Sequence, residues 1–155
     1  AHGVASGVVN AGGDLRCFGA AQPIHVRAPD EPSALLCLGS ISDAAIATSA
    51  GYNSGVQLDG GQVDALVDPV RGHCMAWERS ISVLAADCMT ADALTKVVRL
   101  APHRASRLLH GLDAQAVIID RRGVSACGRE WLQPPPAMGS TATVLAFASG
   151  RAAVR

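Results

Sequence analysis

The chain has 155 residues, which is the length of a single domain with a hydrophobic core. Hydrophobic residues make up 49% of the sequence and charged residues only 17%, a composition that excludes an intrinsically disordered chain. Thirteen acidic side chains balance thirteen basic ones, so the charge gives no indication of a nucleic-acid partner.

The sequence also shows no motif of a zinc site, a disulfide framework, a membrane span or a signal peptide. The five cysteines are widely spaced and form no Cys-x-x-Cys pair, so neither a zinc site nor a disulfide framework is predicted. No apolar run has the length of a membrane span and no signal peptide is visible, which leaves the localisation open. The sequence begins without methionine and reaches a strand-like segment almost at once, so we expect it to be the C-terminal part of a longer fold.

The first half of the chain consists of short apolar runs separated by glycine, proline and asparagine, a pattern typical of strands and turns. Two of these runs flank Gly12-Gly13, which predicts a β-hairpin. Further strands are expected at residues 24–27, 35–41 and 44–48, and another ends at the turn Asp68-Pro69.

The second half combines strands with two helices. Residues 78–88 form a near-continuous apolar run, which predicts a strand in the centre of a sheet. A helix then follows, with Thr90 as its N-cap and apolar residues at helical spacing. A second helix is expected to begin after Pro102 and to end at Gly111, which would act as its C-terminal glycine, before a strand and turn at residues 114–123. These elements predict an α+β or α/β fold with more strands than helices.

Two segments of the first half are candidate ligand-binding loops. Gly12, Gly13 and Asp14 form a loop with little side-chain bulk that a ligand could approach closely, but Gly-Gly is also a common hairpin turn, which we favour. Thr48 and Ser49 end an apolar strand just before a Gly-rich loop. Hydroxyls in that position hold phosphate or ribose oxygens as readily as they occur in ordinary loops, so both interpretations stand equally.

Two carboxylates of the second half have a structural and a functional interpretation. Asp68 precedes Pro69, where an aspartate usually closes an Asx turn on its own backbone; a carboxylate directed at a ligand is the alternative. Asp92 is followed four residues later by Lys96, the only lysine in the sequence, so the two can form an ion pair across one helical turn. The alternative places Asp92 at the mouth of the sheet, where open α/β layers bind ligands.

Taken in order, several segments resemble the C-terminal half of the ApbE family, the FAD:protein FMN transferases. The segments are VVNAGGDLRCFG, AIATSAGYNSG, LVDPVRG, SISVLAADCMTADALTK and AVIIDRRG. The resemblance implies an ApbE-like α+β domain with a mixed sheet and flanking helices. Residues 1–130 would form the C-terminal half of this flavin-binding domain, and residues 131–155 a loosely ordered Pro- and Ala-rich tail. The N-terminal half of the domain would then be a partner of this half.

The resemblance also implies an activity and a set of site residues. Members of the family bind FAD and a magnesium ion, split the pyrophosphate of FAD, and attach FMN to a threonine of a partner protein. The family's positions near the nucleotide correspond to Gly12, Gly13, Asp14, Thr48, Ser49, Asp68 and Pro69. The family's magnesium carboxylate corresponds to Asp92.

Two positions depart from the family pattern. The family's histidine four residues before the proline corresponds to Ala65, and its second magnesium ligand, a threonine one turn after the aspartate, corresponds to Lys96. Thr95 lies one residue earlier, about 100° away around the helix, so we do not expect it to replace that ligand.

A charged lysine cannot ligate a metal ion. We therefore expect Lys96 to direct its charge at a ligand phosphate, with magnesium dependence reduced or lost. Two functions follow from this: FMN transfer from FAD with a diverged metal site, or a non-catalytic flavin-binding module of the same fold.

Overall fold

The computed structural model describes residues 3–29, 31, 33–51, 56–58, 61–63, 66–74, 79–132, 143–144, 146–148 and 151–153. The helices are α1 (Cys88–Leu100) and α2 (Pro102–Gly111). The strands of the first half are β1 (Gly7–Ala11), β2 (Asp14–Phe18), β3 (Gln22–Arg27), β4 (Leu35–Ile41), β5 (Ala45–Ala50), β6 (Val56–Leu58) and β7 (Gly61–Val63). The strands of the second half are β8 (Ser80–Ala85), β9 (Gln115–Asp120), β10 (Gly123–Gly128), β11 (Thr143–Val144), β12 (Ala146–Ala148) and β13 (Arg151–Ala153).

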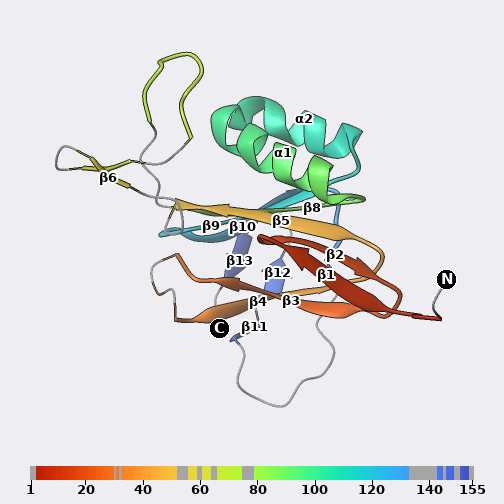
Figure 1. Cartoon of the computed structure of the whole chain (residues 1–155). Helices are drawn as coiled ribbons and strands as arrows, with labels where there is room; N and C mark the ends of the chain where they lie inside the picture. Colours follow the sequence, from red (N-terminus) through yellow and green to blue (C-terminus); the bar gives the residue numbers. More distant parts are fainter. Residues whose placement is uncertain are drawn as a thin grey trace.

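The main sheet has eight strands in the order β1-β2-β5-β8-β9-β10-β13-β12, and each neighbouring pair is antiparallel. A second sheet has the order β11-β4-β3, in which β11 lies parallel to β4 and β3 lies antiparallel to it. Figure 1 shows both helices over one face of the main sheet and the second sheet beneath the other face. The predicted α+β fold, with mixed strand directions and flanking helices, is confirmed.

The main sheet has a hydrophobic core on each face, because successive residues of a strand point to opposite sides. The core beneath the helices contains Ala47, Ile81, Val83, Ala85, Ala91, Leu94, Val98, Ala105, Leu109, Ala114 and Ala116. The core on the side of the second sheet contains Cys17, Ile24, Val26, Leu38, Ile41, Ala44, Ile46, Leu84, Val117, Ile119 and Val124. The central strand β8 is buried at every residue, as its continuous apolar run predicts.

The hairpin predicted around Gly12-Gly13 is also confirmed. β1 and β2 pair in register from Gly7 with Phe18 to Ala11 with Asp14, which leaves the two glycines as the connecting loop. Their φ angles are 68° and 108°, and positive φ at both positions is what a tight two-residue hairpin requires.

The start of α1 differs from the prediction. Its N-cap is Asp87 and not Thr90, because the backbone at Asp87 is extended and its carboxylate accepts a hydrogen bond from the Thr90 amide at 2.8 Å. The Thr90 hydroxyl donates to the same carboxylate, also at 2.8 Å. Aspartate and threonine are both good N-caps, so residue type alone does not decide between two positions so close together.

The end of α2 differs from the prediction as well. The helix begins at Pro102 as expected, but Gly111 is its last helical residue and not the left-handed residue beyond the end. Positive φ, at 53°, occurs instead at Asp113, since aspartate tolerates this conformation better than most residues.

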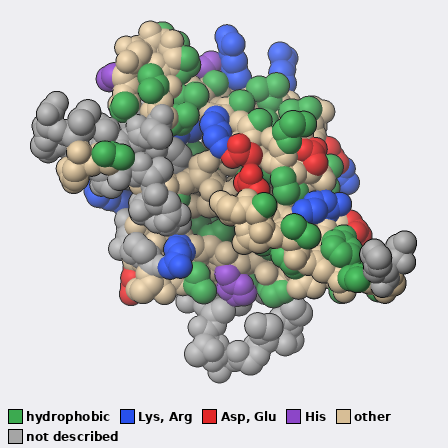
Figure 2. Space-filling model, viewed as in Figure 1, with side chains coloured by type: hydrophobic (Ala, Val, Ile, Leu, Met, Phe, Trp, Pro, Cys, Tyr) green, Lys and Arg blue, Asp and Glu red, His purple; other side chains and the backbone are tan. Residues whose placement is uncertain are grey.

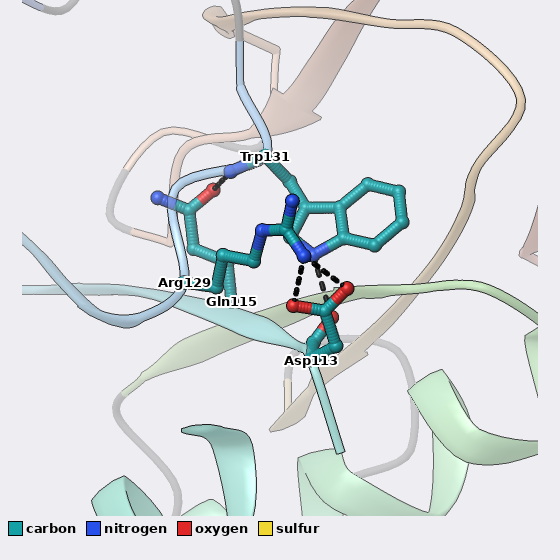
Figure 3. Close-up of polar contacts among 4 residues, drawn as sticks. All are labelled: Asp113, Gln115, Arg129 and Trp131. Atoms are coloured by element: carbon teal, nitrogen blue, oxygen red, sulfur yellow. Dashed lines mark hydrogen bonds and ion pairs between the residues drawn. The ribbon is translucent and has the colours of Figure 1, made fainter. Parts of the chain in front are cut away.

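Polar side chains hold the segment after β10 against the end of α2 and the start of β9 (Figure 3). Gln115 Oε1 accepts hydrogen bonds from the amides of Trp131 and Leu132, at 3.0 and 3.2 Å. The Trp131 indole donates to the Asp113 carbonyl at 2.6 Å, and the Arg129 guanidinium pairs with the Asp113 carboxylate. The same guanidinium lies over the indole, 6.0 Å from the ring centroid. These contacts hold residues 129–132, which follow β10, against Asp113 and Gln115.

Neither helix of the described chain is long and apolar enough to cross a membrane. The segment 131–155 contributes β11 to the second sheet, and β12 and β13 to the main sheet. The division of the chain at residue 130 stays a prediction.

Candidate functional site

The clearest charged pair on the helical layer consists of Asp92 and Lys96 on α1. The Lys96 ammonium donates a hydrogen bond to the Asp92 carboxylate across one helical turn, which confirms the predicted ion pair. The two side chains are 45% and 40% exposed, respectively. A ligand in solution can therefore reach both charged groups.

A pair of hydroxyl groups lies at the contact between α1 and β5, on the same helical turn as this ion pair. Thr95 is completely buried, and its Oγ1 lies 2.8 Å from the Oγ of Ser49. The Thr95 hydroxyl also donates to the Asp92 carbonyl at 2.7 Å. The structure thus links Ser49 on β5 through Thr95 to the backbone of Asp92, and it places the Thr95 side chain in the core while the Lys96 side chain is partly exposed.

The end of the β1–β2 hairpin lies near the start of α1. The two hydrogen bonds from Thr90 lower the pKa of the Asp87 carboxyl, and the positive charge of Arg16 on β2 lowers it further. Partial burial raises the pKa of the Cys88 thiol, and the carboxylate of Asp14 acts in the same direction. This environment disfavours the thiolate, the reactive form of a cysteine.

Thr48 and Ser49 do not share a site, because they are neighbours on one strand and point to opposite faces of the main sheet. Ser49 faces α1, whereas the Thr48 hydroxyl lies 2.8 Å from the hydroxyl of Ser82 on β8, on the face opposite the helices. A ligand bound on the helical side would contact the side chain of Ser49 but not that of Thr48.

The Gly12-Gly13 loop has the geometry of an ordinary hairpin. The Gly13 amide donates to the Asn10 side chain at 3.0 Å, and Asp14 begins β2 directly after the loop. No Cβ at Gly12 or Gly13 would meet another atom within 4 Å. The loop is therefore open on its outer side, and its role beside a nucleotide stays a prediction.

Asp68 and Pro69 form the Asx-type turn that we favoured. The Asp68 carboxylate accepts hydrogen bonds from the amides of Val70 and Arg71, at 2.8 and 3.0 Å, and these bonds lower its pKa. The Arg71 guanidinium lies 3.5 Å from the same carboxylate. Ala65, the position of the family histidine, lies outside the described residues.

The described residues do not fit a magnesium ion on their own. Magnesium requires a near-octahedral set of oxygen ligands, whereas Asp92 is the single carboxylate at this point of α1 and its oxygen is bonded to an ammonium. The neighbouring Thr95 oxygen is engaged with Asp92 and Ser49 inside the core. Across the part of the chain that the structure describes, no three His, Cys, Asp or Glu side chains gather as a metal site. The pair instead presents an ammonium, which suits an anion.

Charges of both signs are interspersed on the face that Figure 2 shows, with acidic and basic side chains beside one another. No large patch of a single sign covers this face. A ligand that bound on this face would be recognised by individual side chains and not by a broad electrostatic field.

Comparison with known proteins identifies the family. The model of the ApbE family matches residues 1–119, which is more than half of the chain. The chain belongs to the ApbE family. Among curated proteins, no sequence matches this one significantly.

Solved ApbE structures have the same fold over most of this chain. The ApbE protein of Thermotoga maritima is 26% identical, with a TM-score of 0.59 over 81% of this chain and 43% of its own. The flavin transferase ApbE of Vibrio cholerae is 25% identical, with a TM-score of 0.54 over 79% of this chain and 42% of its own. The apo flavinyl transferase ApbE of Pseudomonas stutzeri is 20% identical and supports the fold alone, with a TM-score of 0.56. The chain thus spans less than half the length of these relatives.

Two features of the site were not predicted from the sequence. One is Asp87, whose carboxylate caps α1 and lies close to Arg16. The other is the contact between Ser49 and Thr95, which are 46 residues apart. The signal for the second was present in the helix, because Thr95 occupies a buried position between Ala91 and Val98.

Proposed function

We propose that this chain is the part of an ApbE-type flavin transferase that binds FAD through the Asp92–Lys96 pair. The family match over residues 1–119 carries the proposal of a flavin transferase, and the exposed ammonium of Lys96 supports the proposed contact with FAD. The likeness to the flavin transferase of Vibrio cholerae supports a flavin nucleotide as substrate and a flavin-accepting protein as partner. In the reaction, the phosphoanhydride of FAD breaks, a phosphoester forms with a threonine hydroxyl of the acceptor, and AMP and the hydroxyl proton leave.

The role proposed for Lys96 is to bind the diphosphate of FAD. Its ammonium has three donors and is engaged with Asp92 through one described hydrogen bond, so further donors can face a ligand oxygen. Asp92 would hold the ammonium in place, and Ser49 is linked through Thr95 to the backbone of Asp92. The contact proposed with the diphosphate is therefore made by the ammonium of Lys96, since these residues do not fit a magnesium ion.

The family's other nucleotide-binding positions would contact FAD away from the Asp92–Lys96 pair. The open Gly12-Gly13 loop and Asp14 lie on the hairpin near the start of α1, where they would border the nucleotide. Thr48, Asp68 and Pro69 have no described contact with the Asp92–Lys96 pair, so any contact they make with FAD would involve another part of the ligand.

The test measures binding of FAD and release of AMP by the full chain, each with and without magnesium. We expect FAD to bind without magnesium and Lys96→Met to weaken binding roughly 10- to 100-fold, the effect of losing a charged hydrogen bond. Lys96→Arg keeps the charge and is the matched control, so its affinity should remain close to that of the unmodified chain. If FAD binds only with magnesium, or equally well to Lys96→Met, the proposed role of Lys96 is wrong.

The second candidate function is a flavin-binding module without transferase activity. It is favoured by the two departures from the family pattern, Ala65 and Lys96, which remove the family's histidine and its second magnesium ligand. Release of AMP and covalent flavin on an acceptor protein would identify the transferase. FAD binding without either product would identify the module.

A further inference from the structure

The hydroxyl groups of Ser49 and Thr95 connect the main sheet to α1 at the helical turn that carries Asp92 and Lys96. Thr95 is the single polar residue among the four buried residues of this helix, whose other members are Ala91, Leu94 and Val98. Burial of a hydroxyl in apolar surroundings is unfavourable unless the hydroxyl is hydrogen-bonded. Valine has nearly the same shape and would fill this position without that cost. The hydroxyl at Thr95 therefore has a role besides packing.

The direction of the hydrogen bonds follows from the number of protons. Thr95 has one hydroxyl proton, which it donates to the Asp92 carbonyl at 2.7 Å. In its 2.8 Å contact with Ser49, Thr95 must then be the acceptor and Ser49 the donor. The result is a continuous chain of hydrogen bonds from β5 through Ser49 and Thr95 to the backbone of Asp92.

This chain ends on the helical turn that carries the charged pair. The Asp92 carbonyl belongs to the residue whose carboxylate holds the Lys96 ammonium. Apolar packing of α1 on the sheet is not directional, so it allows small sliding movements of the helix. Hydrogen bonds are directional and define the position of this turn relative to β5.

We infer that Ser49 and Thr95 are positioning residues that hold the Asp92–Lys96 pair at one place over β5. The part of this inference that concerns a ligand rests on the proposed binding of FAD at Lys96. Its structural part, the fixed position of Lys96, can be measured without any ligand.

The main variant is Thr95→Val, which removes the hydroxyl and keeps the shape of the side chain. Thr95→Ser is the conservative variant that keeps the hydroxyl. Ile119→Val, in the core on the opposite face of the sheet, is a control for loss of stability alone. We expect Thr95→Val and Ile119→Val to lower Tm by a comparable few degrees, about 2–4 °C for a chain of this size.

The first measurement uses Lys96 as a unique probe, because it is the only lysine in the sequence. Reductive methylation with ¹³C labels its side chain and the N-terminal amine, and Lys96→Arg assigns the two NMR signals. We expect Thr95→Val to shift the Lys96 signal and increase its mobility, and Thr95→Ser and Ile119→Val to leave it unchanged. An unchanged Lys96 signal in Thr95→Val would overturn the inference.

The second measurement is the dissociation constant of FAD with unmodified lysine. Thr95→Val should weaken binding about tenfold, the effect of one hydrogen bond, whereas Thr95→Ser should restore binding to within about twofold. Ser49→Ala combined with Thr95→Val should cost little more than Thr95→Val alone, because both changes break the same chain of bonds. Equal affinities in Thr95→Val and the unmodified chain would show that Ser49 and Thr95 serve stability only.

The two measurements separate the inference from the proposed function. If the unmodified chain does not bind FAD, the proposed function fails, while the Lys96 signal still decides whether Thr95 positions that side chain. If the chain binds FAD and Thr95→Val changes neither the signal nor the affinity, the inference fails and the proposed function stands.

Discussion

Lys96 donates a hydrogen bond to Asp92 across one turn of α1, on a surface where both side chains are more than one-third exposed. An exposed pair at this spacing, with the acid before the base, stabilises a helix by only about 0.2–0.5 kcal/mol. Stability is therefore a weak reason for the single lysine of the sequence to occupy this position. The contact with a ligand phosphate that we propose for Lys96 would give a further reason.

Replacement of Lys96 by threonine should increase the affinity of this turn of α1 for magnesium. Lys96→Thr frees the Asp92 carboxylate from its ammonium partner and places a hydroxyl one helical turn later, where the family has its second ligand. Lys96→Val also removes the ammonium but supplies no oxygen, so it is the matched control. Isothermal titration with magnesium should detect binding to Lys96→Thr that is stronger than binding to Lys96→Val. Equal binding by the two variants would show that position 96 does not contribute to a metal site.

Several of the elements could be predicted from the sequence because each depends on local information. The continuous apolar run of β8 indicates burial on both faces, and Gly12-Gly13 indicates a two-residue hairpin loop. The pairing of Asp92 with Lys96 was predictable for the same reason, since both residues lie on one helix four positions apart.

Features that depend on the path of the chain could not be predicted in this way. Asp87 and Thr90 are both good caps by residue type, and the choice depends on where the chain turns after β8. The contact between Ser49 and Thr95 joins a strand to a helix that lies 46 residues later. The opposite orientations of Thr48 and Ser49 follow from strand geometry once β5 is known to include both residues.

Asp87 should make the stability of the protein depend on pH in the acidic range. The pKa of its carboxyl is lowered from the ordinary value of 3.8 by the two hydrogen bonds from Thr90. A lowered pKa in the folded state means that the carboxylate stabilises the fold above the ordinary pKa and loses this effect as the pH falls through the folded value.

Asp87→Asn and Asp87→Ala separate the cap from its charge. Asparagine is also a good N-cap but does not titrate, so Asp87→Asn should keep most of the stability and lose part of the acid dependence. Asp87→Ala should have a lower Tm at neutral pH because the Thr90 amide loses its acceptor. Thermal melts between about pH 2 and pH 7 test both expectations. A neutral-pH Tm of Asp87→Ala equal to that of the unmodified protein would contradict the assignment of Asp87 as the cap.

Gln115 should be important for the attachment of the segment after β10. The side chain is only 6% exposed, and its one oxygen accepts the amides of both Trp131 and Leu132. Gln115→Met fills a similar volume but leaves both amides without this acceptor, which should cost about 1–3 kcal/mol of unfolding free energy. Gln115→Glu keeps an oxygen at the position and should lose less.

The site of the effect can be located by hydrogen exchange. In Gln115→Met, the amides of Trp131 and Leu132 should exchange faster than in the unmodified protein, relative to amides in the centre of β8. Urea unfolding gives the change in stability, and Gln115→Glu serves as the control for both measurements. Unchanged exchange at Trp131 and Leu132 would show that other contacts hold this segment.

Gly128 and Gly123, at the two ends of β10, allow the cost of backbone strain to be compared with the cost of a steric clash. Both have positive φ, 96° and 114°, so alanine at either position should cost about 1–2 kcal/mol through its backbone conformation. A Cβ at Gly123 would meet no atom within 4 Å, whereas a Cβ at Gly128 would lie 2.3 Å from the Ala114 carbonyl oxygen. That oxygen belongs to the backbone and accepts the Arg129 amide, so it cannot move away without loss of this bond.

Gly128→Ala should therefore be clearly more destabilising than Gly123→Ala, although the two changes are chemically identical. The collision should also displace the corner where Arg129 and Trp131 contact Asp113, so these contacts should weaken as well. Urea unfolding of both variants gives the difference in free energy, and hydrogen exchange of the Arg129 amide reports the displaced contact. Similar losses in the two variants would mean that backbone strain accounts for both and that β10 can shift at its end without cost.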